Sequence, residues 1–198
     1  MKLPGKIPVM LLADSILFPQ AFLPLYIYEE HYRLLLRHAL DSHRLFAIAL
    51  PRRRKPIPYP IGCLGLIRAC VDHPDGTSHL VLQGLCRIRF TAFHTHHPYL
   101  TANYTLHNTH PCDPHPLLDR LAKDIQETIR HITTHHSEFP SWIAPYIGSL
   151  TEHDMLCDIV AHTFIQSLSV KRKIIQEQFL PERLRLVRDA LNHLAEHI

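Results

Sequence analysis

Histidine is the residue type in this chain whose number and spacing are most suggestive of chemistry. The 198 residues include 18 histidines. His131 and His135 are four positions apart on a predicted helix, with His136 next to them, and this spacing can bring two imidazoles to one metal ion. A third protein ligand is not visible nearby, so we expect solvated side chains and no metal. A metal-dependent enzyme is the minor alternative.

The remaining histidine group and the cysteines are also predicted to be structural. His94, His96 and His97 fall in a predicted loop between strands, where solvated side chains are expected. The five cysteines are scattered and never form a CxxC pair; they are Cys63, Cys70, Cys86, Cys112 and Cys157. Apolar surroundings predict reduced, mostly buried thiols and therefore a cytoplasmic protein.

Glycine-dependent and catalytic motifs are absent from the sequence. None of the 6 glycines forms part of GxxxxGK[ST] or GxGxxG, and neither GxSxG nor HExxH occurs. These motifs cradle phosphates, expose a nucleophile or hold zinc. We therefore predict a protein without enzymatic activity and without a cofactor.

One basic run could contact phosphates. Arg52, Arg53, Arg54 and Lys55 precede three closely spaced prolines, which exclude a continuous helix or strand. Aromatic residues do not interleave with the run, and the net charge of the chain is only +3. A solvated loop is the preferred interpretation, and RNA binding through these four residues is the alternative.

The elements that would position these residues are clearest between residues 16 and 50. Glu29 and Glu30 suit the first turn of a helix. The apolar face of that helix is predicted to be Tyr32, Leu35, Leu36, Ala39 and Leu40. Pro19 and Pro24 flank residues 22–23, which predicts an extended segment or an edge strand. A buried strand is predicted over residues 45–50.

Further strands are predicted on both sides of this stretch. They cover residues 7–12, 61–71, 80–90 and 99–106. The run from His73 to Thr77 contains Pro-Asp-Gly and predicts a tight hairpin turn. Residues 1–107 thus give about six strands and one helix.

Three prolines between residues 107 and 116 mark a change of composition, and we place a boundary there. Residues 1–110 form a predicted β-rich subdomain, and residues 111–198 form a predicted helical bundle. The first helix of the bundle has the apolar positions Leu118, Leu121, Ile125, Ile129 and Ile132. The run Thr151-Glu152-His153-Asp154 is similar to a capping box at the start of another helix. The predicted fold class is α+β.

The segment FPQAFLPLYIYEEHY resembles the signature that opens the Lon protease N-terminal (substrate-binding) domain family. The match consists of Phe18, Pro19, Pro24, Leu25, Ile27, Tyr28, Glu29 and Tyr32. Gly84, Arg87 and Phe90 follow in family-like positions, as do Lys173 and Glu182-Arg183-Leu184. The resemblance implies a PUA-like β pseudo-barrel followed by a helical bundle. Motifs of the Lon ATPase and peptidase domains are absent, so the resemblance implies a stand-alone, non-catalytic form.

The resemblance also implies a surface that binds polypeptide, which we expect at the rim of the β-rich part. The predicted surface residues are Phe18, Phe22, Tyr28, Glu30 and His31, with Trp142 from the apolar stretch 139–150. The alternative is that the three aromatic residues of the first group belong to the core. Expected partners are unfolded or exposed apolar segments and a separate protease, in protein quality control. Membrane insertion is not expected, because no window of about 18 apolar residues occurs.

Overall fold

The computed structural model describes residues 3–111, 115–135 and 139–196. The chain folds as two compact units, Met1–Asn108 and Thr109–Ile198, and each is described by itself. A domain boundary at residue 110 stays a prediction. The expectations for Cys112 and His136 lie outside the described residues.

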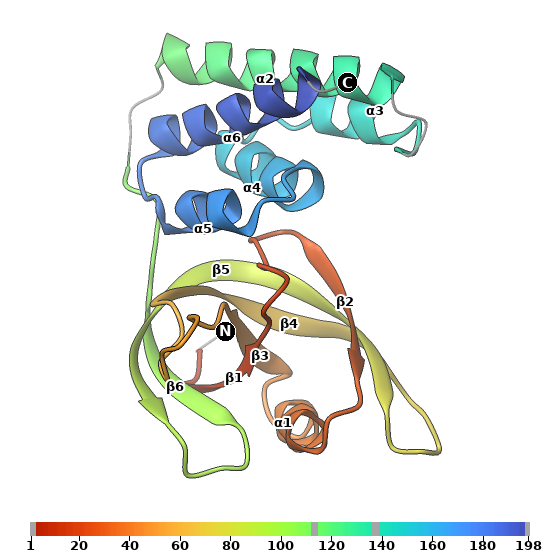
Figure 1. Cartoon of the computed structure of the whole chain (residues 1–198), viewed down its shortest axis with the longest axis vertical. Coiled ribbons are helices and arrows are strands. Elements are labelled where there is room, and N and C mark those ends of the chain that lie inside the picture. The colour runs from red at the N-terminus through yellow and green to blue at the C-terminus, as the bar shows by residue number, and fades with distance from the viewer. Residues whose placement is uncertain (1–2, 112–114, 136–138, 197–198) are drawn as a thin grey trace. The chain divides into compact units, whose positions relative to one another are not determined.

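The first unit consists of six strands and one helix (Figure 1). The strands are β1 (Lys6–Leu11), β2 (Phe22–Ile27), β3 (Leu45–Ala49), β4 (Ile61–Asp72), β5 (Ser78–His94) and β6 (Leu100–Leu106). The helix is α1 (Glu30–Leu40). The predicted number and order of elements in this part of the chain are confirmed, and so is the α+β class.

The long strand β5 closes the sheet. It pairs with β4 along one edge, while its other edge pairs first with β2 and then with β6. Because β6 also pairs with β1, the strands β1, β3, β4, β5 and β6 form a closed ring, and β2 lies outside it as an end strand. β1 and β3 are parallel, and the other pairs are antiparallel. Closure removes free strand edges from this part of the sheet.

Apolar side chains are buried on both sides of β3. One side contributes to the interior of the ring, whose buried members are Ile7, Val9, Leu45, Ala47, Ala49, Leu64, Ile88, Phe90 and Ala102. Phe46 and Ile48 alternate with them and are equally buried. Successive residues of a strand point to opposite faces, and α1 packs against β1 and β3. The helix therefore covers the outside of these two strands with Leu35, Leu36 and Ala39.

A glycine in β5 allows the segment before β2 to pack tightly. The carbonyl oxygen of Phe18 lies where a Cβ on Gly84 would stand, at 2.0 Å. The Gly84 amide donates to the carbonyl of Ala21, and the Gln20 amide donates to the carbonyl of Gly84. Phe18 itself is fully buried. Any larger residue at position 84 would push this segment away.

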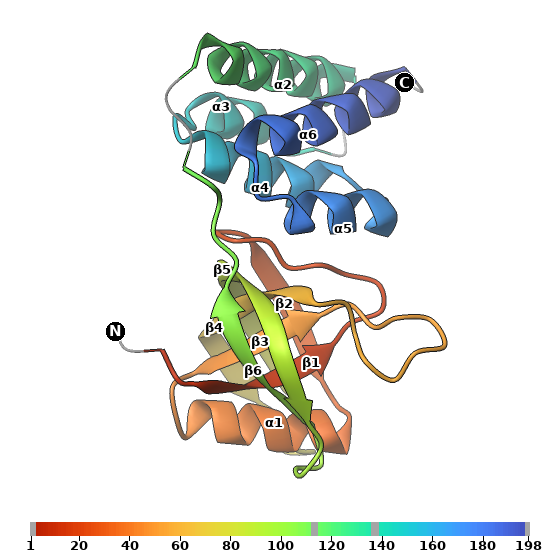
Figure 2. The same cartoon turned by 90° about the vertical axis from the view of Figure 1, so that its left-hand side faces the viewer.

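The second unit is helical (Figure 2). Its helices are α2 (Pro116–His135), α3 (Ile143–Gly148), α4 (His153–Phe164), α5 (Leu168–Gln176) and α6 (Leu180–Ala195). α6 packs against α2, α4 and α5. The predicted apolar face of α2 is buried. No helix in the described part of the chain has the length and apolar character needed to cross a membrane.

The predicted capping box at the start of α4 is wrong. The N-cap residue is Glu152, and its side chain makes no capping hydrogen bond. Asp154 instead accepts hydrogen bonds from the fully buried guanidinium of Arg183 and from the hydroxyl of Thr109. The Asp154 carboxylate therefore pairs with Arg183 on α6 and does not cap the start of α4.

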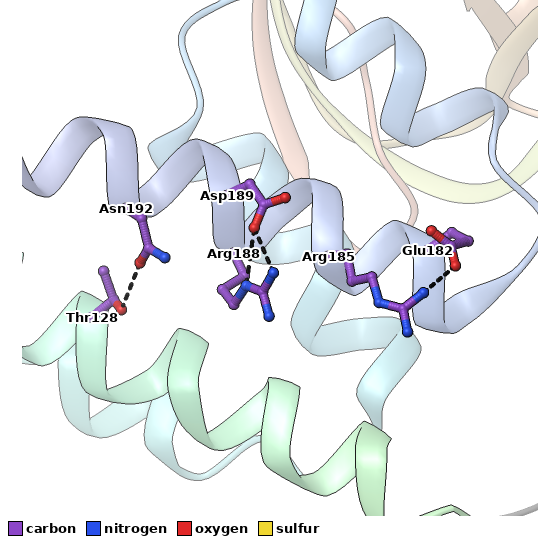
Figure 3. A network of polar contacts seen from close by, with 6 residues as sticks. All are labelled: Thr128, Glu182, Arg185, Arg188, Asp189 and Asn192. Atoms are coloured by element: carbon purple, nitrogen blue, oxygen red, sulfur yellow. Dashed lines mark hydrogen bonds and ion pairs between the residues drawn. The ribbon is translucent and has the colours of Figure 1, made fainter.

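A separate polar network lies on the surface of α6 (Figure 3). Arg188 forms an ion pair with Asp189 at 2.7 Å, and Arg185 pairs with Glu182. Asn192 Oδ1 lies 3.4 Å from the hydroxyl of Thr128 on α2. Exposed pairs of this kind stabilise a protein by at most about 1 kcal/mol. We therefore interpret these pairs as ordinary solvent-exposed contacts of the helix surface without a functional role.

Candidate functional site

Three strand segments extend beyond the closed ring as an arm, formed by β2, the first half of β5 and the second half of β4. In this arm Tyr26 lies opposite His79, which lies opposite Val71 on its other side. The next row consists of Pro24, Val81 and Ala69. We call the side of the arm with these residues the outer face, and it also includes Phe22 and Tyr28.

The outer face is apolar and open to solvent. The exposed fraction is 55% for Phe22, 49% for Tyr26, 59% for Tyr28 and 61% for Val71. Of the residues that alternate with them on the inner side, Ile27, Leu80 and Leu82 are buried, and Leu23 and Leu25 are half-buried. Inner and outer sides of the arm are therefore both apolar, and only the inner side is covered.

A shallow hollow with a volume of about 390 Å³ lies on the outer face. Its lining residues are Pro24, Leu25, Tyr26, Ala69, Cys70, Val71, His79, Leu80 and Val81. Clustered apolar side chains exposed on a folded unit are characteristic of surfaces that bind other molecules. The hollow suits aliphatic and aromatic groups rather than charged ones.

His79 occupies the centre of the outer face. Its ring stacks on Tyr26 with 4.6 Å between ring centroids. Its Nδ1 lies 2.7 Å from Nε2 of His73, so one of the two rings donates a hydrogen to the other. The ring of Tyr26 in turn lies 5.7 Å from that of Tyr28. These contacts fix three aromatic rings in one row.

Proline occupies the middle of the end strand β2. Proline has no amide hydrogen, so it is tolerated only where a strand nitrogen needs no partner strand. Pro24 therefore fits a position whose nitrogen points away from β5. An added strand would find no donor there, so side-chain contacts are the better mode of binding at this face.

A second groove, of about 470 Å³, lies where β2 leads into α1. Its lining includes Tyr26, Tyr28, Glu29 and Tyr32. The Tyr32 hydroxyl accepts from the Leu11 amide at 3.2 Å and lies 3.1 Å from the carbonyl of the same residue. Burial raises the pKa of the Tyr32 hydroxyl. This hydroxyl is occupied in holding α1 to the end of β1.

The predicted surface residues of the first unit do not share one environment. Phe18 is 0% exposed, so its placement on the binding surface was wrong: it belongs to the core. Phe22 and Tyr28 are exposed on the outer face, which contradicts the alternative that they are core residues. Glu30 is exposed and His31 half-buried in the first turn of α1, just after Tyr28.

Trp142 belongs to the helical unit. It is 61% exposed at the N-terminus of α3 and meets Tyr146 edge to face, with 6.2 Å between ring centroids. It is therefore a separate aromatic surface of the second unit. Its part in binding stays a prediction.

Sequence reasoning missed Tyr26, Val71 and His79 as members of the outer face. A signal was present, because residues 22, 24, 26 and 28 are Phe, Pro, Tyr and Tyr, all on one side of an extended strand. The odd-numbered residues between them are apolar too. A strand that is apolar on both sides must be covered twice or left open on one side.

The basic loop is largely solvated. Arg53, Arg54 and Lys55 are exposed between β3 and β4. Arg52 is half-buried, and its guanidinium carbon lies 5.1 Å from the centre of the Tyr59 ring. A cation above an aromatic face is a packing contact. The arrangement gives the RNA alternative no support.

The histidine groups outside the arm make local contacts. His135 Nδ1 lies 2.8 Å from the carbonyl oxygen of His131, which is one helical turn away. His97 stacks on Tyr99, and His94 lies 3.1 Å from the Asn103 side chain. Within the described residues, no three His, Cys, Asp or Glu side chains are grouped so that they could hold a metal ion.

The four described cysteines form no disulfide with one another. Cys63 and Cys157 are buried, and Cys70 and Cys86 are half-buried. Burial raises the pKa of the Cys86 thiol, and burial together with the Asp72 carboxylate raises the pKa of Cys70. Because the thiolate is the nucleophile, a raised pKa makes these thiols less reactive.

Comparisons with known proteins point to one family. The sequence model of the ATP-dependent protease La (LON) substrate-binding domain matches residues 6–193. The Lon protease of Desulfosudis oleivorans is 29% identical over 205 residues, covering 98% of this chain and 25% of that protein. The Lon protease of Dictyoglomus thermophilum is 24% identical over 190 residues, covering 93% and 24%. The chain thus spans about a quarter of the length of these relatives.

Solved structures show the same fold. The N-terminal domain of the Mycobacterium avium complex Lon protease matches with a TM-score of 0.77 and 19% identity, covering 94% of this chain and 98% of that one. A Lon N-terminal domain protein from Xanthomonas campestris matches with a TM-score of 0.68 and 18% identity, covering 91% and 95%. Since the family match extends over nearly all of the sequence, this chain belongs to the Lon substrate-binding domain family.

Proposed function

We propose that this chain binds exposed apolar segments of other polypeptides on its outer face and cuts none of them. It would act as a recognition module in protein quality control, supplying substrates to a separate protease in the cytoplasm. The observation that carries the proposal is the open apolar face of the arm, on a chain of the Lon substrate-binding domain family.

Recognition would rest on side-chain contacts. Phe22, Tyr26, Tyr28 and Val71 each leave about half of their surface in water. Covering roughly 100 Å² on each of them would contribute about 10 kcal/mol at about 25 cal/mol per Å². Lost translational and rotational freedom offsets about 4–15 kcal/mol of that gain. At most about 6 kcal/mol remains, so the expected affinity is tens of micromolar or weaker, which suits transient capture.

Sequence-specific recognition is not expected. The hollow is lined by apolar groups and by backbone, with His79 as its main polar side chain. Apolar contacts depend on buried area and only weakly on direction. Segments that alternate aromatic or aliphatic residues with small polar ones would fit an open strand face of this kind.

Binding to a capped peptide of Leu, Phe and Ser, with a dye whose charge does not change with pH, tests the proposal. Replacing Tyr26→Ser together with Val71→Ser is expected to weaken binding at least tenfold at pH 7.5, measured by fluorescence anisotropy. Both side chains are half exposed, so the free energy of unfolding should fall by less than about 1 kcal/mol. Unchanged affinity in the folded double variant contradicts the proposal.

Two further variants accompany this test, one as a matched control and one as a test of the helical unit. Ile57→Ser removes an equally exposed apolar side chain from the loop between β3 and β4, and binding is expected to stay within twofold. Trp142→Ser asks whether the helical unit contributes. A loss with Trp142→Ser but not with the outer-face variant would place the site on α3 instead.

A further inference from the structure

The outer face contains a proton-sensitive pair at its centre. His79 is part of the apolar hollow, and its Nδ1 lies 2.7 Å from Nε2 of His73, which begins the hairpin turn after β4. The two rings meet edge to face, with 5.0 Å between their centroids. A contact this short between imidazole nitrogens holds one hydrogen, donated by either ring according to the tautomer.

The contact between the two imidazole nitrogens persists only while at most one of the rings is protonated. With both rings neutral, or with one of them protonated, a single hydrogen still lies between the two nitrogens. With both rings protonated, each of the facing nitrogens carries a hydrogen and a positive charge, so the contact cannot survive. The second proton must therefore separate the rings and disturb the stack of His79 on Tyr26.

Charged and polar groups surround the pair in the turn, on β4 and on α1. In the turn, hydrogen bonds from the Thr77 amide and hydroxyl lower the pKa of Asp75, so its carboxylate stays ionised. On β4, Asp72 accepts from the Ser78 hydroxyl at 2.7 Å, and the pKa of Cys70 is raised. On α1, the Arg33 guanidinium lies beside Gly76 of the turn.

Groups on β2 and on the start of α1 complete this environment. Tyr26 stacks on His79, and the ring of Tyr28 lies next to that of Tyr26. The imidazole of His31 lies 3.7 Å from the Glu29 carboxylate and is close in sequence to Tyr28, so a further histidine lies near the outer face. A test must therefore separate His31 from the His73–His79 pair.

We propose that the His73–His79 pair makes guest binding on the outer face proton-sensitive, so that apolar segments bind at neutral pH and are released on acidification. This inference rests on the proposed function, because it concerns the same face. A guest that covers His79 must remove water from any charge there, and removing water from an unpaired charge is unfavourable. Binding thus favours the neutral pair, and affinity falls as the pH falls.

Histidine is the side chain type that ordinarily changes charge between pH 5 and pH 8. One such group can weaken binding by up to about tenfold between pH 7.5 and pH 5.5. In the wild-type protein, the capped peptide is therefore expected to bind about tenfold more weakly at pH 5.5. Because the peptide has no ionisable group, this change reports on the protein.

The ratio of the affinities at the two pH values is the readout for the variants. In His73→Gln/His79→Gln the ratio is expected to fall below two, whatever the affinity at pH 7.5. His131→Gln/His135→Gln, which alters the other close pair on α2, should keep the wild-type ratio, and so should His31→Gln. A wild-type ratio below two, or a wild-type ratio retained in the His73/His79 variant, overturns the inference.

Ring ¹⁵N NMR of the protein without peptide keeps the two proposals distinguishable. The titration curve of His79 is expected to change when His73 is replaced by Gln, because the rings share a hydrogen. Superimposable curves overturn the proton-sensitive pair even if peptide binds. Absence of peptide binding at both pH values, with coupled curves, sinks the proposed function and leaves the coupled pair established.

Discussion

Two apolar strand surfaces of the first unit differ in what covers them. The outside of β1 and β3 is covered by α1, and Phe46 and Ile48 are fully buried there. The outer face of the arm is just as rich in aromatic and aliphatic side chains, yet Tyr26 and Val71 are half exposed or more. The fold thus covers one apolar surface with its own helix and leaves the other open to solvent. Substitutions on each surface test that contrast.

The largest expected loss of stability comes from comparing two phenylalanines that are four residues apart, one buried and one on the outer face. Phe18→Ala removes a fully buried ring, and the free energy of unfolding is expected to fall by about 4 kcal/mol. Phe22→Ala is the matched control and should cost less than about 1 kcal/mol, since its ring is more than half exposed. Urea unfolding measures both. Equal losses would mean that Phe22 is packed and that the outer face is covered.

The helical unit offers a change of intermediate size. Asp154→Asn leaves the buried Arg183 guanidinium without its charged partner, and a loss of about 3 kcal/mol in unfolding free energy is expected. This figure is the lower end of the usual range, because Asp154 is itself 45% exposed. Affinity for the capped peptide should not change while the protein stays folded. A parallel loss of affinity would show that the arm does not act alone.

The smallest effect concerns the anchor of the covering helix. Tyr32→Phe removes the hydroxyl that contacts the Leu11 backbone, at an expected cost of about 1 kcal/mol. Burial raises the Tyr32 pKa, so its stabilising contribution is complete below the reference value of about 10 and is lost as the pH rises above it. Urea unfolding between pH 8 and 11 should show this decline in the wild type. An identical decline in Tyr32→Phe would contradict the assignment.

The elements of the fold could be predicted because each has a local signal. The apolar periodicity of residues 118–132 and the Pro-Asp-Gly turn depend only on neighbouring residues. Closure of the ring was expected only from the family resemblance, which implies a β pseudo-barrel. Local sequence patterns do not predict it, because it requires one strand, β5, to pair with β2 and with β6 on the same edge. That arrangement depends on bulges and twist rather than on residue type.

The candidate site was only partly predictable for a related reason. Phe18 and Phe22 have the same side chain and flank the same proline-containing segment, yet one packs over Gly84 and the other faces solvent. Tyr26, His79 and Val71 are distant in sequence, and the hairpin register is what aligns them. The sequence shows which residues are apolar. Tertiary contacts decide which of these residues are buried and which stay exposed.

Pro24 also bears on how copies of this chain behave toward one another. A flat, apolar end strand is the usual starting point for fibre growth, because its unpaired backbone N–H and C=O groups can pair with a strand of another chain. A ring nitrogen in the middle of β2 interrupts that template, while its aromatic neighbours remain displayed. We therefore expect the chain to expose these aromatic side chains at high concentration without forming ordered β-aggregates.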